Sequence, residues 1–241
     1  MDTSSYVGIS AQNALQRRMT TIANNVANAG TVGFRAEGVH FSSLVSPTRP
    51  FRTTFATLGA QHVDTRSGGL VKTDNALDVA IEGAAFMAID TPAGVAYTRD
   101  GRMQMLATGE LVSLTGHPIL DVSGGPLTLD PTGGPAQIAR DGMIRQNGRA
   151  VGAVGLFQLD FTKPYSRYEN ASFIPKVPPE PIVEFTEDGV LQGFVEQSNV
   201  NPIVEMTNLI KVSRAFEAVA SSLERRDSSL RDAIQTLGAK S

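Results

Sequence analysis

The sequence predicts an α+β fold in which long N- and C-terminal helices pair as a coiled coil and an all-β domain of many hairpins is inserted between them. Three observations predict it. Residues 4–29 contain no proline and a single glycine, and a leucine-rich heptad pattern runs through residues 209–237. The middle of the 241-residue chain holds most of its 23 glycines and 13 prolines at short intervals, which is typical of strands joined by turns.

The N-terminal segment has the apolar spacing of a helix. Four apolar residues recur at intervals of four, three and four, which places them on one helical stripe: Leu15, Met19, Ile22 and Val26. Gly30 follows where a helix would end with a left-handed residue. The segment is also rich in amides, among them Asn24, Asn25 and Asn28. Because amides are mediocre helix formers, we expect neighbouring surfaces to stabilise this helix.

The C-terminal segment has a clear start signal and a heptad repeat. Asn201 and Pro202 fit an N-cap followed by the first helical position. The main line of the repeat consists of Leu209, Phe216, Leu223, Leu230 and Leu237, and a second line, three residues earlier in each heptad, consists of Met206, Ala220 and Ile234 with interruptions at Ser213 and Asp227. This pattern predicts a coiled-coil or long bundle helix, with an ordinary amphipathic helix as the alternative.

The region from about residue 39 to residue 194 is predicted to be β. Residues 77–81 and 85–89 resemble strands separated by Gly83. Asp-Gly pairs at 100–101, 141–142 and 188–189 predict hairpins, because both residue types tolerate positive φ. Residues 163–181 are rich in proline and predict an extended connector. We therefore expect an N-terminal helix (1–35), an irregular β connection (36–75), the inserted β domain (76–175), a returning connector (176–200) and the C-terminal helix (201–241).

Composition excludes several classes of function. The net charge of −3, without a basic block, gives no electrostatic basis for nucleic-acid binding, and the absence of cysteine excludes thiolate chemistry. The sequence has no apolar run long enough to span a membrane and no cleavable signal pattern. His40, His62 and His117 lack zinc-site spacing, and no hydrolase elbow or phosphate-binding loop occurs. We therefore expect no catalytic residue, no metal and no cofactor.

Two alternatives from other classes stay open at this point. Scattered carboxylates, including Asp64, Asp78 and Glu82, would allow a glycan-binding or cell-wall-hydrolysing β protein, although aromatic sugar platforms are few. An adhesin-like binding module is the second alternative. The helical ends instead favour a structural protein, because head-to-tail contacts between such faces generate open helical filaments.

Three motifs carry a family resemblance. Residues 23–28 (Ala-Asn-Asn-Val-Ala-Asn) with Gly33-Phe34-Arg35 resemble the N-terminal signature of the flagellar basal-body rod proteins, and residues 197–202 (Gln-Ser-Asn-Val-Asn-Pro) with residues 213–217 resemble their C-terminal signature. Residues 97–101, 109–112 and 116–121 resemble the β domain of the longer rod and hook members. The resemblance covers essentially the whole chain.

The resemblance implies a structural, non-enzymatic subunit of the hollow periplasmic rod, exported by the flagellar type III apparatus without a cleaved signal. Chain length and the proline after Asn-Val-Asn favour the proximal rod type over the distal rod or hook type. The expected partners are other rod proteins, copies of this chain and the export apparatus, with no nucleic acid and no membrane span. The expected assembly interface comprises Leu15, Met19, Ile22, Asn24, Asn25, Val26, Asn28 and Phe34 near one end, and Asn199, Asn201, Met206, Leu209, Phe216, Leu223 and Leu230 near the other.

Overall fold

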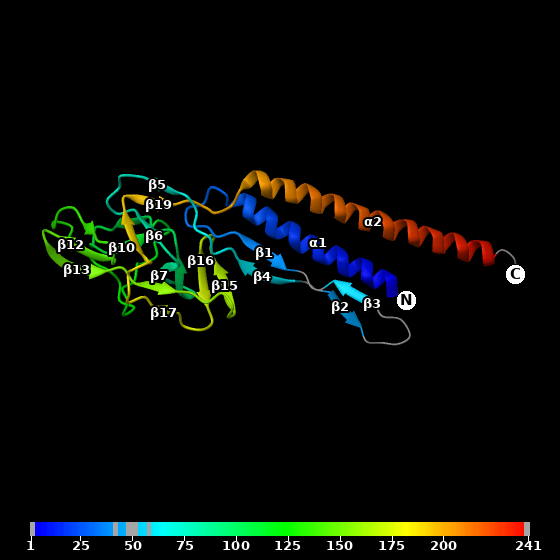
Figure 1. Cartoon of the computed structure of the whole chain (residues 1–241), viewed down its shortest axis with the longest axis horizontal. Coiled ribbons are helices and arrows are strands. Elements are labelled where there is room, and N and C mark those ends of the chain that lie inside the picture. Colours follow the sequence, from blue (N-terminus) through cyan, green and yellow to red (C-terminus); the bar gives the residue numbers. More distant parts are fainter. Residues whose placement is uncertain (1–2, 41–42, 47–52, 57–58, 239–241) are drawn as a thin grey trace. The chain divides into compact units, whose positions relative to one another are not determined.

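The computed structural model describes residues 3–40, 43–46, 53–56 and 59–238, and the chain divides into two compact units. The helical unit comprises Met1–Ala27, Glu37–His62 and Asn201–Ser241, and the β unit comprises Asn28–Ala36 and Val63–Val200. The structure is thus a mixture of helices and strands, with a helix near each end of the chain and many β-hairpins between them (Figure 1). This confirms the predicted α+β class at that level.

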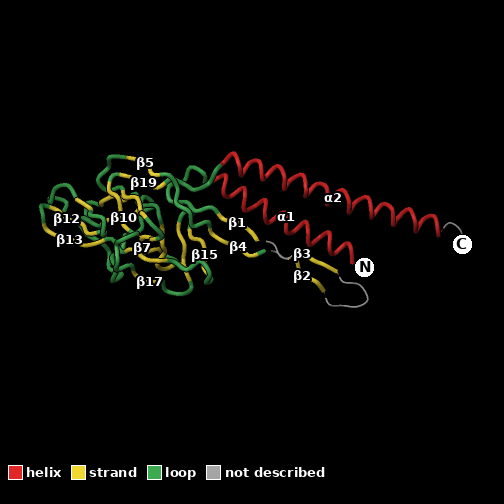
Figure 2. Tube along the Cα trace, viewed as in Figure 1, coloured by secondary structure: helices red, strands yellow, loops and turns green. Residues whose placement is uncertain are grey.

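The helical unit is built on two helices that run antiparallel, side by side (Figures 1 and 2). They are α1 (Thr3–Ala27) and α2 (Pro202–Gly238). Gly8 lies against Leu223, and Asn25 is hydrogen-bonded to Glu205, so the start of α1 lies beside the later part of α2. Two short ribbons belong to the same unit: β1 (Glu37–His40) pairs with β4 (Ala60–Val63), and β2 (Ser43–Ser46) pairs with β3 (Thr53–Ala56).

The predicted start of α2 is confirmed, whereas the predicted end of α1 is not. The side-chain oxygen of Asn201 accepts hydrogen bonds from the backbone nitrogens of Ile203 (3.1 Å) and Val204 (3.2 Å), and α2 begins at Pro202, so the predicted cap is confirmed. The predicted left-handed stop at Gly30 is wrong: α1 ends at Ala27, and the first positive φ after it is at Gly33 (+70°). A side chain at Gly33 would collide with the backbone of residues 99–100, so glycine is required there by close packing as well as by φ.

The β unit contains the other fifteen strands: β5 (Leu70–Lys72), β6 (Val79–Glu82), β7 (Ala85–Thr91), β8 (Gly94–Thr98), β9 (Met103–Met105), β10 (Leu111–Ser113), β11 (Gln137–Ile138), β12 (Met143–Gln146), β13 (Arg149–Ala153), β14 (Leu156–Gln158), β15 (Tyr165–Tyr168), β16 (Ser172–Pro175), β17 (Glu180–Pro181), β18 (Gly189–Gln192) and β19 (Phe194–Glu196). Six form one antiparallel sheet in the order β15-β16-β8-β7-β14-β17. A three-stranded sheet, β11-β12-β13, and the pairs β9–β10, β6–β18 and β5–β19 complete the unit.

Strand β7 explains where the core lies. Its residues alternate between two apolar clusters, because successive side chains of a strand point to opposite faces. Met87 and Ile89 belong to the larger cluster, whereas Phe86 and Ala88 belong to the smaller, aromatic one with Phe173. Both faces of β7 are therefore covered, and the predicted strands at 77–81 and 85–89 are confirmed in outline by β6 and β7.

Only one of the three Asp-Gly pairs closes a hairpin. Gly142 lies in the turn between the paired strands β11 and β12. The strands on either side of Gly101 pair with other partners, and Gly189 is the first residue of β18, which pairs with β6. Asp188 instead accepts a hydrogen bond from the backbone nitrogen of Ala84 (2.6 Å), which ties together distant segments. A two-residue hairpin turn is formed by Asn147 and Gly148, both with positive φ, and it joins β12 to β13.

The proline-rich stretch 163–181 is not a simple connector. It supplies β15, β16 and β17, and β15 and β16 form a hairpin on one side of the six-stranded sheet. Phe173 on β16 is fully buried among aromatic rings of the smaller cluster, including Phe161 and Tyr165. This aromatic packing outweighs the disruptive effect of the prolines, which lie at strand ends or between strands.

Candidate assembly surface

The face of α1 that packs against α2 carries most of the predicted apolar stripe. Ile22 is buried, and Leu15, Met19 and Val26 are half-buried. Ala14 is also buried, one position from Leu15, so the covered face is broader than the stripe alone. The four predicted residues therefore lie together on one side of the helix.

The covered face of α2 is shifted from the predicted pattern. The main heptad line is half-buried at Leu209, Phe216 and Leu223, but among the described side chains of α2 the most buried is Val212, at 5% exposure. Met206, on the predicted second line, is 53% exposed and does not lie on the side packed against α1. The backbone of Leu230 belongs to α2, while its side chain lies outside the described part of the structure. Of the other second-line residues, Ala220 is half-buried, and the side chain of Ile234 lies outside the described part of the structure. One position earlier in the repeat, Glu205 is hydrogen-bonded to Asn25 of α1 and Val212 is buried.

Asn25 joins three elements of the helical unit. Its side-chain amide donates to the backbone oxygen of Glu37 (2.8 Å) and to the Glu205 carboxylate (3.2 Å), and its oxygen accepts from the backbone nitrogen of Glu37 (3.0 Å). At 3% exposure, this amide satisfies its own hydrogen-bonding groups and fixes the β1 strand beside both helices. Neighbouring Asn24 is half-buried.

The opposite face of α1 carries a row of exposed, uncharged side chains, bordered by the half-buried Arg17. At intervals of three and four residues it presents Tyr6, Ile9, Asn13, Gln16, Thr20, Ala23 and Ala27, which we call the uncharged stripe. Tyr6 and Ile9 are each about half exposed. An exposed helix face normally carries charged residues, so a face of aromatic, aliphatic, amide and alanine side chains has the composition of a surface that another molecule covers.

The first turns of α2 expose a second apolar surface. Ile203, Val204, Met206 and Ile210 are between 51% and 76% exposed. Three of them, at positions 203, 206 and 210, share one helical face. Asn201, the N-cap, is exposed beside them. These residues and the uncharged stripe are the two surfaces of the described helical unit that are best suited to contacts between molecules.

Three of the predicted interface residues are instead engaged inside the β unit. Phe34 is fully buried, with the Arg167 guanidinium 4.6 Å from its ring centre. The Asn199 amide accepts from the backbone nitrogen of Ala36 (2.8 Å) and donates to the backbone oxygens of Asp64 and Arg66 (2.9 Å each). Asn28 is buried and accepts a hydrogen bond from the Thr31 hydroxyl (3.1 Å). Within one chain, these side chains hold the segments that follow α1 and precede α2.

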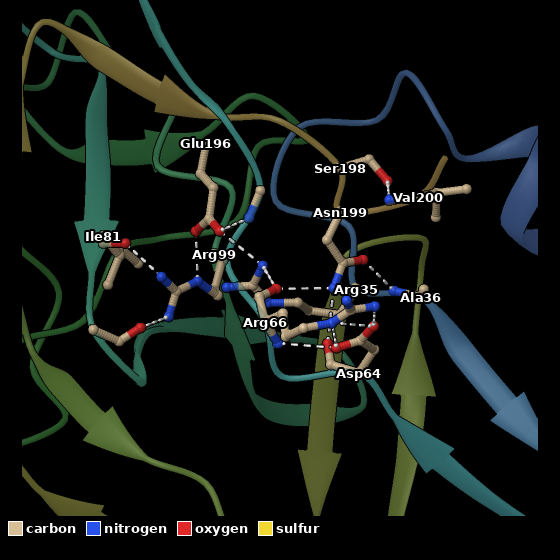
Figure 3. Close-up of polar contacts among 12 residues, drawn as sticks. Arg35, Ala36, Asp64, Arg66, Ile81, Arg99, Glu196, Ser198, Asn199 and Val200 are labelled. Atoms are coloured by element: carbon tan, nitrogen blue, oxygen red, sulfur yellow. Dashed lines mark hydrogen bonds and ion pairs between the residues drawn. The ribbon is translucent and has the colours of Figure 1, made fainter. Parts of the chain in front are cut away.

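A buried cluster that the sequence did not reveal lies next to Asn199 (Figure 3). Glu196 is completely buried between two arginines: its Oε1 lies 2.7 Å from Arg35 Nη1 and its Oε2 lies 2.6 Å from Arg99 Nε. Both arginines are 1% exposed. We refer to Arg35, Arg99 and Glu196 as the arginine–glutamate node. Arg35 belongs to a motif that carried the family resemblance, but nothing in the sequence pairs it with Glu196.

The two arginines of the node differ in how well they are satisfied. Arg99 also donates to the backbone oxygens of Ile81, Gly83 and Ala85. Arg35 donates through Nη1 to the backbone oxygen of Arg66 (2.7 Å), whereas its Nε and Nη2 have no partner among the residues that the structure describes. Burial and the nearby Arg99 charge lower the pKa of the Arg35 guanidinium and outweigh the Glu196 carboxylate, which raises it.

The histidines and acidic residues form no recognisable reaction centre in the described part of the chain. His40 and His62 stack on each other at 4.1 Å, and His117 lies 3.1 Å from the exposed Glu169 carboxylate. Among the residues that the structure describes, no group of three histidines or acidic side chains could hold a metal ion. None of the described helices has the length and apolarity of a membrane-spanning segment.

Comparison with known proteins covers the same three regions as the motifs. Models for "Flagella basal body rod protein", "Flagellar hook protein FlgE/F/G D1 domain" and "Flagellar basal body rod FlgEFG protein C-terminal" match residues 6–35, 80–146 and 191–236. The flagellar basal-body rod protein FlgF of Mesorhizobium japonicum is 50% identical over the full length of both chains, and that of Rhizobium meliloti is 44% identical over 99% of each. This chain belongs to the flagellar basal-body rod protein family.

The FlgF relatives confirm the family resemblance and the predicted proximal type. The flagellar basal-body rod protein FlgG of Buchnera aphidicola is 30% identical and covers 96% of this chain, consistent with a relationship across the family. Because the relatives are structural rod proteins, the expectation that this chain is not an enzyme is also confirmed, against the cell-wall hydrolase alternative.

Proposed function

We propose that this protein is a structural subunit of the proximal flagellar rod, which polymerises through its terminal helices into a hollow shaft that transmits torque and admits exported flagellar proteins. The observation that carries the proposal is the uncharged stripe of α1, an exposed helix face without an ionisable group other than the Tyr6 phenol. If another subunit covers these residues, no charged side chain among them is buried without a partner, and the alanine positions allow close approach. Family membership supports the same conclusion.

Within a subunit, we propose that α1 and α2 pair as a coiled coil. Leu209, Phe216 and Leu223 supply one side of the seam, and Leu15, Met19 and Ile22 supply the other. Neighbouring subunits then cover the uncharged stripe and the exposed start of α2, including Met206. Contacts of this heterologous type propagate as a helical filament when the rotation between subunits does not close.

The proposed surroundings follow from the family. The partners are other rod subunits, copies of this chain and the flagellar type III export apparatus, and the location is the periplasmic part of the basal body. Export without a cleaved signal predicts that protein recovered from assembled basal bodies still carries its first residues. N-terminal sequencing of that protein checks this, and a start well inside α1 would contradict it.

Substitution on the uncharged stripe tests the proposal without disturbing the fold of the subunit. Ala23→Lys places a charge at an exposed position near the C-terminal end of α1, where the helix dipole favours a cation. We expect unchanged helix content and thermal stability in the purified chain, but loss of swimming and of intact rods when the variant is the sole copy in the cell. Ala107→Lys, at an exposed turn of the β unit, is the matched control and should support normal motility.

Leu223→Asp tests the proposed seam directly. The half-buried Leu223 contacts Gly8, so a carboxylate there would be buried against α1. We expect assembly to fail while the β unit stays folded, as judged by near-ultraviolet circular dichroism. Normal basal bodies with Ala23→Lys and Leu223→Asp would overturn the proposed function.

A further inference from the structure

All the sulfur of this chain is in methionine. The sequence contains seven methionines and neither cysteine nor tryptophan, so methionine is the side chain that a mild two-electron oxidant attacks most readily. The product is methionine sulfoxide, which replaces a flexible apolar side chain by a polar one. Such an oxidant therefore reacts first at the methionine sulfur that it can approach.

The methionines differ widely in exposure. Met87 is fully buried and Met103 is 4% exposed, while two others are half-buried. Among the methionine side chains that the structure describes, only Met105 and Met206 are exposed, at 36% and 53%. In the described part of the free chain, Met206 is therefore the methionine most open to an oxidant in solution.

Met206 lies in the middle of the exposed apolar surface at the start of α2. Ile203 precedes it by three residues and Ile210 follows it by four, and all three are more than half exposed on one helical face. Met206 does not lie on the side of α2 that packs against α1, so oxidation there changes the outer surface of the chain and leaves its core intact. Met105, by contrast, lies on β9 in the β unit.

We propose that Met206 is an oxidation-sensitive site that decides whether a free subunit can be incorporated into the rod. This inference rests on the proposed function, in which a neighbouring subunit covers the start of α2. With hydrogen peroxide, the Met206 sulfur attacks one peroxide oxygen, so that an S–O bond forms while the O–O bond breaks. The sulfur is oxidised by two electrons and the peroxide is reduced. The proton of the transferred oxygen goes to the departing hydroxide, which leaves as water.

The sulfoxide oxygen is poorly compatible with a covered apolar surface. It is a hydrogen-bond acceptor placed between Ile203 and Ile210, and burying it without a donor is unfavourable. Once a neighbour covers Met206, the sulfur is shielded from the oxidant, so the site is sensitive before assembly and protected after it. Methionine sulfoxide reductases restore the thioether, which makes the block reversible.

Peptide mass mapping after treatment with hydrogen peroxide tests the site. In the purified full chain, the Met206 peptide should gain one oxygen at least about tenfold faster than the Met87 and Met103 peptides, whose sulfurs are buried. In isolated basal bodies, Met206 should react at least about tenfold more slowly than in the free chain. Equal rates for Met206 and Met87 in the free chain, or equal rates for Met206 in the free and assembled states, would overturn the proposal.

Three variants test the consequence for assembly. Met206→Gln places an uncharged polar group of similar length on α2, and it should leave the helix content of the purified chain unchanged but abolish swimming and intact rods when it is the sole copy. Met105→Gln, at the other exposed methionine, is the matched control and should support normal swimming. Met206→Leu should assemble rods, and cells that build new rods in sublethal peroxide should keep swimming with this variant when cells with the unmodified chain do not.

The outcomes separate this inference from the proposed function. Normal swimming with Met206→Gln, or equal peroxide sensitivity with Met206→Leu and the unmodified chain, contradicts the inference. If Ala23→Lys and Leu223→Asp block assembly in the same experiments, the proposed function stands while the role of Met206 falls. If those two variants assemble normally, the proposed function itself has failed.

Discussion

Replacing Glu196 by glutamine tests how strongly the arginine–glutamate node stabilises the β unit. The carboxylate accepts from three groups: Arg35 Nη1 at 2.7 Å, Arg99 Nε at 2.6 Å and the backbone nitrogen of Gly68 at 2.7 Å. Glutamine has nearly the same shape, but it removes the carboxylate charge that is paired directly with both buried guanidiniums. It also directs an amide NH₂ group at one of these donors.

The expected loss of stability is large. Removing one partner of a buried ion pair costs about 3–5 kcal/mol, because the remaining charge is left uncompensated. For a chain of this size, about 2–4 °C of melting temperature corresponds to each kcal/mol, so Glu196→Gln should lower the melting temperature by about 6–20 °C. Backbone oxygens continue to satisfy much of Arg99, which favours the lower half of this range.

Differential scanning calorimetry of the full chain measures this shift. Asp74→Asn is the matched control: it also converts a carboxylate to an amide in an ion pair of 2.7 Å, with Lys72, but both side chains are more than half exposed. Asparagine tolerates the positive φ of Asp74 (+59°), so the control should change stability by less than about 1 kcal/mol. Equal shifts in the two variants would refute the argument that burial makes the node important.

Three further predictions concern single local features. Gly148→Ala should destabilise the chain by about 1–2 kcal/mol, because φ is +75° at Gly148 and a side chain there would otherwise meet open space. Gly30→Ala, also in open space but without a positive φ, should be nearly neutral. Urea unfolding measures both variants, and equal effects would refute the role of φ. Asn201→Ala should cost about 1 kcal/mol by removing the α2 cap, so its helical circular dichroism signal should be lost at a lower denaturant concentration than that of the exposed control Asn13→Ala. Matching unfolding curves for the two variants would count against the cap. Hydrogen bonds from Arg66 hold the pKa of Asp64 below its ordinary value of 3.8, so this carboxylate stabilises the fold above that pH and the contribution is lost as pH falls through the lower folded value; Asp64→Asn should flatten the acid side of the stability profile, and an unchanged slope would contradict the prediction.

Local signals in the sequence predicted the helical ends well. The α2 start needs only Asn201 and Pro202, which act within one turn, and the apolar stripe through Ile22 depends on helical spacing alone. The exposure of Met206, on the second heptad line, has a physical reason. The position of Val212 between the Leu209 and Phe216 turns depends on where α1 lies, and spacing within α2 cannot specify that.

The β unit was predictable as a class but not in its pairings. The Asp188-Gly189 pair predicts a hairpin turn, yet the Asp188 carboxylate accepts a hydrogen bond from the backbone nitrogen of Ala84, which is 104 residues earlier in the chain. Asn147 followed by Gly148 is also a hairpin signal, and these two residues do close the turn between β12 and β13. Glu196 and Arg99 are 97 residues apart, so their contact arises from the tertiary fold and leaves no local pattern.

The arginine–glutamate node also constrains when the β unit can fold during synthesis of the chain. Ribosomes make the chain from its N-terminus, so Arg35 and Arg99 exist before the carboxylate that both require. The strand pairs β5–β19 and β6–β18 have the same property, because each joins residues near position 75 to residues near position 192. A growing chain therefore cannot complete the β unit until Glu196 and Asn199 have emerged. Folding of the β unit before that point is unfavourable, because it would bury Arg35 and Arg99 without the Glu196 carboxylate that pairs with them.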